Sequence, residues 1–333
     1  MPKITKTQLT AMLRITDTFR LLCFHGQISV LTITGFLCGI AVQFIMSLPL
    51  VKLYSSGGTI ENSGKIVQSV YLIYLLLWGG TLFSMLWRAS DVIYIPYENS
   101  NGIWGKLLIA GMIALVCLYS SSTGLKAVSR SAVIAMSAGV ISLLIVVISA
   151  SFGSDWNNIL TTKTSDSFMT EVTRGFFLSG GLGSFAVFLS YTKGSPLKNT
   201  IYYFTGKIIL TVTVTISSIL VAGGIMKITE FPVVTAGQLA QPFSVQRIDS
   251  LFLIIFAVFA VFSIAIQSLA STELLIKIFP KFKKLRTTSV LAVMVGTAFI
   301  FTGKNNSFIN IIAIGIILFL LPSAVLLKRS LSK

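Results

Sequence analysis

The sequence predicts an all-α polytopic membrane protein with about ten transmembrane helices. Hydrophobic residues make up 54% of the 333 residues and the mean hydropathy is +0.88, which exceeds the range of soluble domains. Apolar stretches recur along the whole chain, and each approaches the ~20 residues that a helix needs to cross the hydrocarbon core. They lie at 8–24, 28–51, 66–87, 103–120, 131–151, 175–192, 206–226, 248–276, 288–303 and 308–327.

The basic residues between these stretches alternate in number from one side to the other. The richer set holds 16 residues, namely Lys3, Lys6, Lys52, Lys65, Lys126, Arg130, Lys193, Lys198, Lys277, Lys281, Lys283, Lys284, Arg286, Lys328, Arg329 and Lys333. The poorer set holds 7, namely Arg88, Lys106, Lys163, Arg174, Lys227, Arg247 and Lys304. Because cytoplasmic loops carry the excess of Lys and Arg, we expect both termini on the cytoplasmic side of an inner (cytoplasmic) membrane.

The composition also argues against several classes of function. The net charge of +16 is explained by short loops beside anionic lipid, so we expect the lipid bilayer and not nucleic acid as the partner. His25 is the only histidine and has no acidic cluster beside it in the sequence. We therefore expect no metal site, no catalytic residues and no cofactor, and a protein that is not an enzyme.

Ten spans within a single transmembrane domain, residues 1–333, divide into two sets of five. The first five-helix repeat is predicted at 8–151 and the second at 175–327. An odd number of spans per half reverses the orientation of the second half, which is the arrangement of an inverted repeat. Transporters built in this way bind their substrates near the middle of the membrane.

The first span of each half is its least regular one. Charged residues interrupt the span at 8–24, and three glycines and two serines interrupt the span at 175–192. Irregular backbone survives in lipid only where protein or a wet cavity satisfies it, and buried charges mark functional sites. The sequence therefore predicts a ligand-binding site at the residues Thr16, Asp17, Thr18, Ser179, Gly180, Gly181, Gly183 and Ser184.

Simpler interpretations stay open at this point. Glycines in membrane helices often serve close helix packing, which is our interpretation of Gly35 and Gly39 and an alternative for the segment 180–184. The span at 8–24 could instead lie in the membrane interface. Arg14, Asp17 and Arg20 share one helix face, so either arginine is a candidate partner for the carboxylate.

Four short motifs stand out along the chain: Ile4-Thr-Lys-Thr-Gln8-Leu, His25-Gly-Gln-Ile-Ser29-Val with Lys52-Leu-Tyr54, Ser122-Thr-Gly124-Leu125-Lys126-Ala127-Val-Ser-Arg130, and Val245-Gln-Arg247-Ile248-Asp249-Ser250. In these motifs the chain resembles the spore germination permease family, the B subunits of germinant receptors within the amino acid–polyamine–organocation superfamily. Two features depart from the family pattern. Lys126 stands where the family usually has Glu, and the first span lacks the Gly-Pro hinge that cradles the ligand carboxylate in many members.

The resemblance implies a LeuT-like fold of two inverted five-helix repeats that recognises an amino acid or a similar small solute. It further implies assembly with the A and C subunits of a germinant receptor in the inner membrane of a spore. A free-standing secondary amino-acid transporter is the alternative, because both functions need the same pocket in the middle of the membrane.

Overall fold

Helices make up nearly all of the described structure. The computed structural model describes residues 3–93, 103–153, 156–161, 167–227, 229–240, 249–280, 286–301 and 307–331. The ten predicted spans correspond in order to α1 (Lys6–Leu22), α2 (Val30–Ser55), α3 (Lys65–Ile93), α4 (Ile103–Thr123), α5 (Leu125–Gly153), a broken span from α7 (Phe168–Gly175) to η3 (Leu189–Tyr191), α9 (Pro196–Ala222), α11 (Asp249–Ile278), α12 (Arg286–Phe301), and α13 (Ser307–Gly315) with η7 (Ile316–Leu320) and α14 (Leu321–Leu331). Short helices in the connections are η1 (Ile60–Asn62), α6 (Asn157–Thr161), η4 (Gly223–Lys227) and α10 (Pro232–Leu239).

Local sequence signals mark the starts of three of the long helices. Thr5 and Ser29 are the N-caps of α1 and α2, and each forms a capping box with the residue three positions later, which satisfies two otherwise unpaired backbone N–H groups. Pro196 stands in the first turn of α9, where its fixed φ suits a helix start and no N–H is needed. As a result α9 begins well before residue 206, where the apolar stretch was predicted to start.

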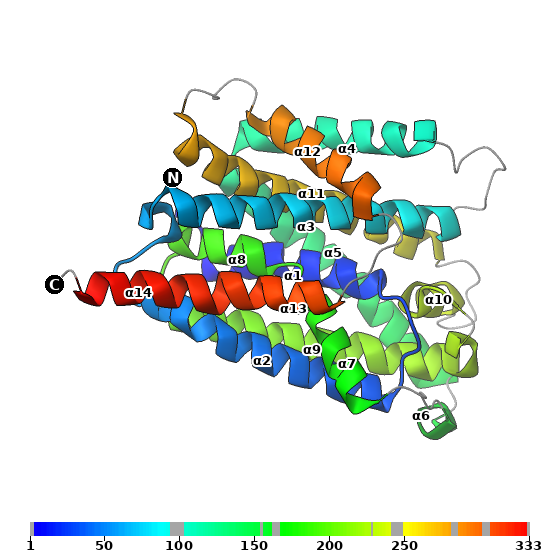
Figure 1. Ribbon diagram of the computed structural model, residues 1–333. Helices are drawn as coiled ribbons and strands as arrows, with labels where there is room; N and C mark the ends of the chain where they lie inside the picture. The colour runs from blue at the N-terminus through cyan, green and yellow to red at the C-terminus, as the bar shows by residue number, and fades with distance from the viewer. Residues whose placement is uncertain are drawn as a thin grey trace.

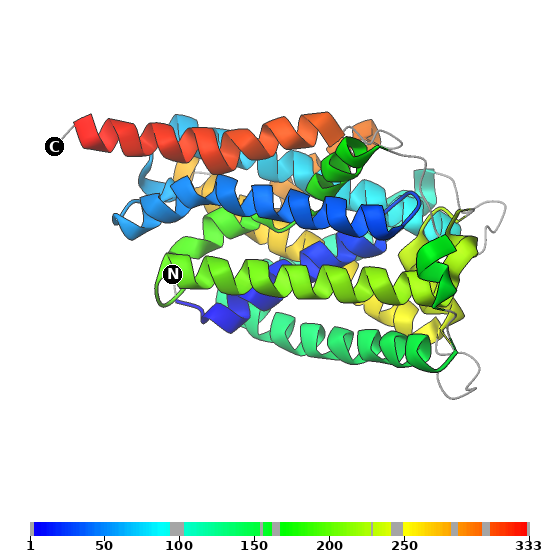
Figure 2. The same cartoon turned by 90° about the horizontal axis from the view of Figure 1, so that it is seen from below.

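Helix α1 lies inside the bundle (Figures 1 and 2), packed against α5, α9 and α11. From Leu9 to Leu22 every residue except Arg14 is buried. A helix enclosed in this way is not an interfacial helix, so that alternative is wrong. Helix α1 is one continuous helix, so its charged residues interrupt the apolar run of the sequence and not the backbone.

The sixth span, in contrast, is broken. Helix α7 continues into η2 (Phe176–Leu178), and α8 (Leu182–Phe188) begins only after the non-helical residues Ser179–Gly181. Helix α7 packs closely on α2: a Cβ at Gly35 would lie 2.5 Å from the backbone of Glu171, and one at Gly39 would lie 2.8 Å from Gly175. The close packing predicted for Gly35 and Gly39 is therefore confirmed.

Both chain termini lie at the same end of the bundle (Figure 1). At this end the backbone of Ile4 bonds to Tyr191 and Lys193, and Lys277 pairs with Glu61. At the other end Arg88 forms an ion pair with Glu230. Residues of the basic-rich set, such as Lys193 and Lys277, thus lie at the end with the termini, and Arg88 of the poorer set lies at the opposite end. That the end with the termini is cytoplasmic stays a prediction.

In the part of the chain that the structure describes, seven helices are long and apolar enough to cross a membrane, namely those within Val30–Ser55, Lys65–Asp91, Ile103–Thr123, Leu125–Ile148, Pro196–Met226, Phe252–Ile278 and Asn310–Leu331. Large apolar side chains such as Leu108, Ile134 and Ile209 are exposed on the outside of α4, α5 and α9. In water such a surface would be unfavourable, but in a bilayer it faces lipid. The protein is therefore a multi-pass membrane protein.

Candidate ligand site at the break in the sixth span

The break in the sixth span depends on glycines that let side chains from α1 and α9 approach the backbone. A Cβ at Gly180 would lie 2.5 Å from Cδ of Arg20, and one at Gly181 would lie 3.1 Å from the hydroxyl of Tyr203. The non-helical backbone predicted here is confirmed for Gly180 and Gly181. It is wrong for the rest of the predicted segment 180–184, because Leu182, Gly183 and Ser184 lie within α8. The missing side chain of Gly183 makes room for the Tyr74 ring.

The carboxylate of Asp17 faces this break. Its Oδ1 atom accepts a hydrogen bond from the backbone N–H of Gly181 at 3.2 Å, and its Oδ2 atom accepts one from the hydroxyl of Tyr203 at 2.5 Å. Only 4% of the residue is exposed. Asp17 therefore joins α1 and α9 to the non-helical segment.

Lys207 of α9 is the cation that pairs with Asp17. Its Nζ atom lies 3.4 Å from Oδ1 of Asp17 and donates to Oε1 of Gln43 at 3.0 Å and to the carbonyl of Leu178. The side chain is 1% exposed, and its three N–H groups have three acceptors. A buried ion pair needs such additional hydrogen bonds to offset its desolvation.

The predicted partners of Asp17, Arg14 and Arg20, have other contacts. The guanidinium of Arg20 lies over the Trp78 ring, 4.1 Å from its centroid. Arg14 donates to the carbonyl of Tyr202 at 3.1 Å. Helix α1 stays continuous with three charged residues because α3 and α9 supply these contacts.

Helix α3 forms a further wall of the site. Trp78 donates from Nε1 to the carbonyl of Gly180 at 3.0 Å, and its ring stacks on that of Tyr74 with centroids 5.6 Å apart. Oγ of Ser179 at the break and the hydroxyl of Tyr74, whose ring packs on Gly183 of α8, are buried and have no hydrogen-bond partner in the described part of the chain. A buried polar group without a partner costs roughly 1–3 kcal/mol.

The remaining candidate residues have local structural roles. Ser184 donates to Oε1 of Gln267 at 2.7 Å, which ties α8 to α11. Thr16 and Thr18 donate to the carbonyls of Met12 and Arg14, four residues earlier in α1. The methyl group of Thr16 faces Gly180, whereas Thr18 takes no part in the hydrogen bonds that the structure shows at the break.

The sequence-based prediction missed Lys207, Tyr203, Gln43, Tyr74 and Trp78. For Lys207 a signal existed: Arg14, Arg20 and Lys207 are the three basic residues that belong to neither loop set, since they fall within the predicted spans. No comparable signal marks the other four, because Tyr, Trp and Gln are common in membrane helices. Among the described residues no group of three or more His, Cys, Asp or Glu side chains could hold a metal ion.

In comparisons with known proteins, the chain is similar to solved structures by its fold and not by its sequence. No family model and no curated protein matches the sequence. Mhp1, a nucleobase-cation-symport-1 family transporter solved in a closed conformation with bromovinylhydantoin bound, matches with a TM-score of 0.61 and 13% identity over 93% of this chain and 74% of its own. MhsT, solved in complex with L-phenylalanine, matches with a TM-score of 0.54 and 14% identity over 98% of this chain and 89% of its own. At this low identity the likeness is one of fold alone: the chain is an all-α membrane protein with the LeuT fold of two inverted five-helix repeats.

Proposed function

We propose that this protein binds an amino acid or a similar small solute at the break in the sixth span. The observation that carries the proposal is the buried Oγ of Ser179 in the non-helical backbone, together with the buried hydroxyl of Tyr74 on α3; neither atom has a hydrogen-bond partner among the described residues. A ligand that hydrogen-bonds to both atoms would recover the free energy that their burial costs. The two similar structures carry small organic molecules, L-phenylalanine in MhsT and bromovinylhydantoin in Mhp1.

The charges around the break favour a ligand with a carboxylate. Three buried charged side chains, Asp17, Arg20 and Lys207, lie around the break. Hydrogen bonds to ionised groups are stronger than those between neutral groups. The carboxylate and amino group of an amino acid would therefore suit this site better than a neutral solute.

At a finer level we propose that the protein is a spore germination permease, the B subunit of a germinant receptor, with A and C subunits as partners in the inner membrane of a spore. The four motifs between Ile4 and Ser250 support this role by resemblance. We also propose that the two repeats extend over 8–151 and 175–327. A free-standing secondary transporter is the second candidate, because Mhp1 is by its description a transporter.

Ligand binding can be tested by a thermal-shift screen of the amino acids against the purified full-length protein, because a ligand that binds only the folded state stabilises it. We expect at least one amino acid to raise the melting temperature in a concentration-dependent way. A ligand at about 100 times its Kd stabilises the folded state by roughly 2.7 kcal/mol. If no amino acid raises the melting temperature at about 100 times a millimolar Kd, the proposed ligand class is wrong. Co-purification with A- and C-type subunits would favour the receptor, and uptake by the protein alone in proteoliposomes would favour the transporter.

A further inference from the structure

A groove separate from the break runs along the outside of the bundle between α5 and α9. It has a volume of about 410 Å³ and is lined by apolar side chains that include Met136, Val140 and Leu144 of α5 and Ile209 of α9. Ile209 is 61% exposed and Leu144 is 51% exposed. Since exposed apolar side chains of a membrane helix face lipid, the groove opens toward the bilayer.

One end of the groove is strongly basic. The guanidinium of Arg14 and the ammonium of Lys6 lie against the same Tyr202 ring, 5.4 and 5.3 Å from its centroid. Arg14 lines the groove, and its buried Nε atom has no hydrogen-bond partner among the described residues. The nearby carboxylate of Asp17 is taken by Gly181, Tyr203 and Lys207 at the break.

Gly206 makes room for this arginine. Any Cβ at position 206 would overlap the guanidinium of Arg14, so a larger residue would force the cation out of its place. A half-buried cation whose Nε donor has no partner among the described residues is costly in a membrane unless an anion or water meets it. The pocket of the arginine is therefore a built feature of α1 and α9 and not a chance surface charge.

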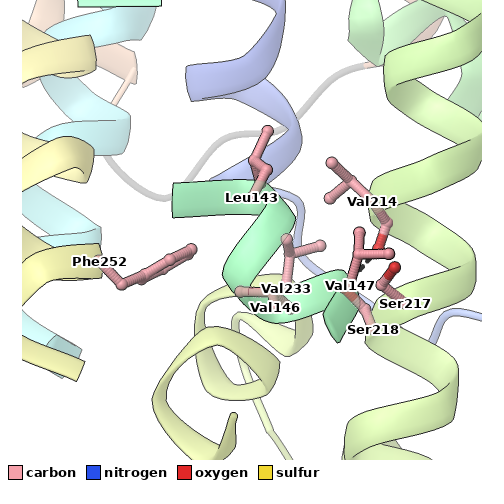
Figure 3. Close-up of a pocket in the computed structure, with 8 residues that line it drawn as sticks. All are labelled: Leu143, Val146, Val147, Val214, Ser217, Ser218, Val233 and Phe252. Carbon is pink, nitrogen blue, oxygen red and sulfur yellow. Dashed lines mark hydrogen bonds between the residues drawn. The ribbon is translucent and has the colours of Figure 1, made fainter. Parts of the chain in front are cut away.

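The other end of the groove is apolar. Leu143, Val147 and Val214 line both the groove and a smaller adjoining pocket. Figure 3 shows these three side chains beside Val233 of α10 and Phe252 of α11. From Tyr202 to Val214 the groove follows α9 for about 18 Å, close to the ~15 Å of hydrocarbon in one leaflet.

From this arrangement we propose that the groove binds an anionic phospholipid, with its phosphate at Arg14 and Lys6 and one acyl chain between α5 and α9. The basic end adjoins Lys6, the first residue of α1, on the side that carries both termini. Basic pockets between membrane helices on the cytoplasmic side are known to bind anionic headgroups. The positive charges of Arg14 and Lys6 complement the phosphate, and the length of the apolar groove matches the hydrocarbon thickness of one leaflet.

The lipid would be connected to the break through two shared helices. Arg14 precedes Asp17 by one turn of α1, and Tyr202 and Gly206 are sequence neighbours of Tyr203 and Lys207 in α9. A phosphate that holds Arg14 therefore also fixes the faces of α1 and α9 that carry the ion pair. This inference does not depend on the proposed function, because the groove and the break are lined by different atoms.

The proposal can be tested by native mass spectrometry of the full-length protein. The protein is incubated with equal amounts of phosphatidylglycerol and phosphatidylcholine that carry the same acyl chains, and the retained lipid is counted. We expect phosphatidylglycerol to be retained preferentially, and the preference to fall about tenfold in Arg14→Gln, as the loss of one charged hydrogen bond would give. Equal retention of both lipids by the wild-type protein would overturn the proposal.

Three further variants separate the site from general surface charge and from misfolding. Lys6→Gln, at an exposed helix end, should also reduce the preference, and Ile209→Trp should reduce retention by filling the groove without a change of charge. Lys65→Gln removes an exposed cation at the same end of the bundle, outside the groove, and should retain phosphatidylglycerol as the wild type does. An equal loss in Lys65→Gln, or competition by inorganic phosphate at the lipid's own concentration, would overturn the lipid site.

Discussion

Replacing Asp17 by Asn would remove a buried charge while preserving the shape of the site. The Asn oxygen can accept from Gly181 and Lys207 in the place of Oδ1, and its NH₂ group can donate to the hydroxyl oxygen of Tyr203 in the place of Oδ2. The three contacts are kept, but the buried O–H of Tyr203, which donates to Oδ2 of Asp17, loses its acceptor. The loss of stability in Asp17→Asn therefore combines the charge with this unpaired donor, and the coupling to Lys207 isolates the charge.

The size of the effect follows from the 3.4 Å that separates Nζ of Lys207 from Oδ1 of Asp17. Coulomb's law with an effective dielectric constant of about 20 gives an attraction of about 5 kcal/mol. Removing one partner of a buried pair destabilises proteins by roughly 3–5 kcal/mol, whereas replacing both by neutral groups is often tolerated. We therefore expect Asp17→Asn and Lys207→Met each to cost about 3–5 kcal/mol, and the double variant to cost clearly less than their sum.

The free energy of unfolding can be measured in mixed micelles for the wild type, both single variants and the double variant. We expect a coupling energy of about 2–3 kcal/mol, near the upper end for residues in contact. Arg88 and Glu230 provide the matched control, since their ion pair is roughly one-third exposed on both sides and should couple by about 0–1 kcal/mol. If the Asp17–Lys207 cycle is additive, or no larger than that of the control pair, the buried pair does not organise the site.

The other predictions concern packing and topology. Gly39→Ala should lower the free energy of unfolding by about 1–3 kcal/mol, as overpacking does, because its Cβ would lie 2.8 Å from Gly175. As a control, Gly111→Ala meets open space and should be nearly neutral. Equal stabilities of the two variants would contradict the packing between α2 and α7. In single-cysteine labelling from outside the cell, positions 283 and 333, which lie outside the described residues, should be protected and position 160 should react. Labelling of position 283 would contradict the orientation inferred from the basic loops.

Local signals allowed the order of the spans and the position of the break to be predicted. Glycines at 180 and 181 indicated non-helical backbone because a membrane helix rarely needs them adjacent except for close approach or unwinding. The same reasoning failed at Gly183, whose role is to admit the Tyr74 ring from α3. Helical and non-helical glycines look alike in a sequence, since the difference is made by what packs against them.

The partner of Asp17 could not be found from local spacing. Arg14 and Arg20 are its neighbours on α1, but Lys207 lies 190 positions further along the chain, and only the packing of α9 against α1 brings the two together. Charged residues interrupt the apolar run of the first span, but α1 is one continuous helix. Contacts from α3 and α9 satisfy these charges, so the backbone of α1 does not unwind.

The affinity of Ser179→Ala for an amino acid that stabilises the wild type would test the central claim most directly. The change removes a buried hydroxyl that has no partner in the described structure, so stability should stay the same or rise, while the Kd should increase about 2- to 10-fold through loss of one ligand hydrogen bond. Ser129→Ala, a buried serine whose hydroxyl donates to the carbonyl of Lys126, is the control that should leave the Kd unchanged. If Ser179→Ala binds the ligand as tightly as the wild type does, the ligand does not contact the break at Ser179.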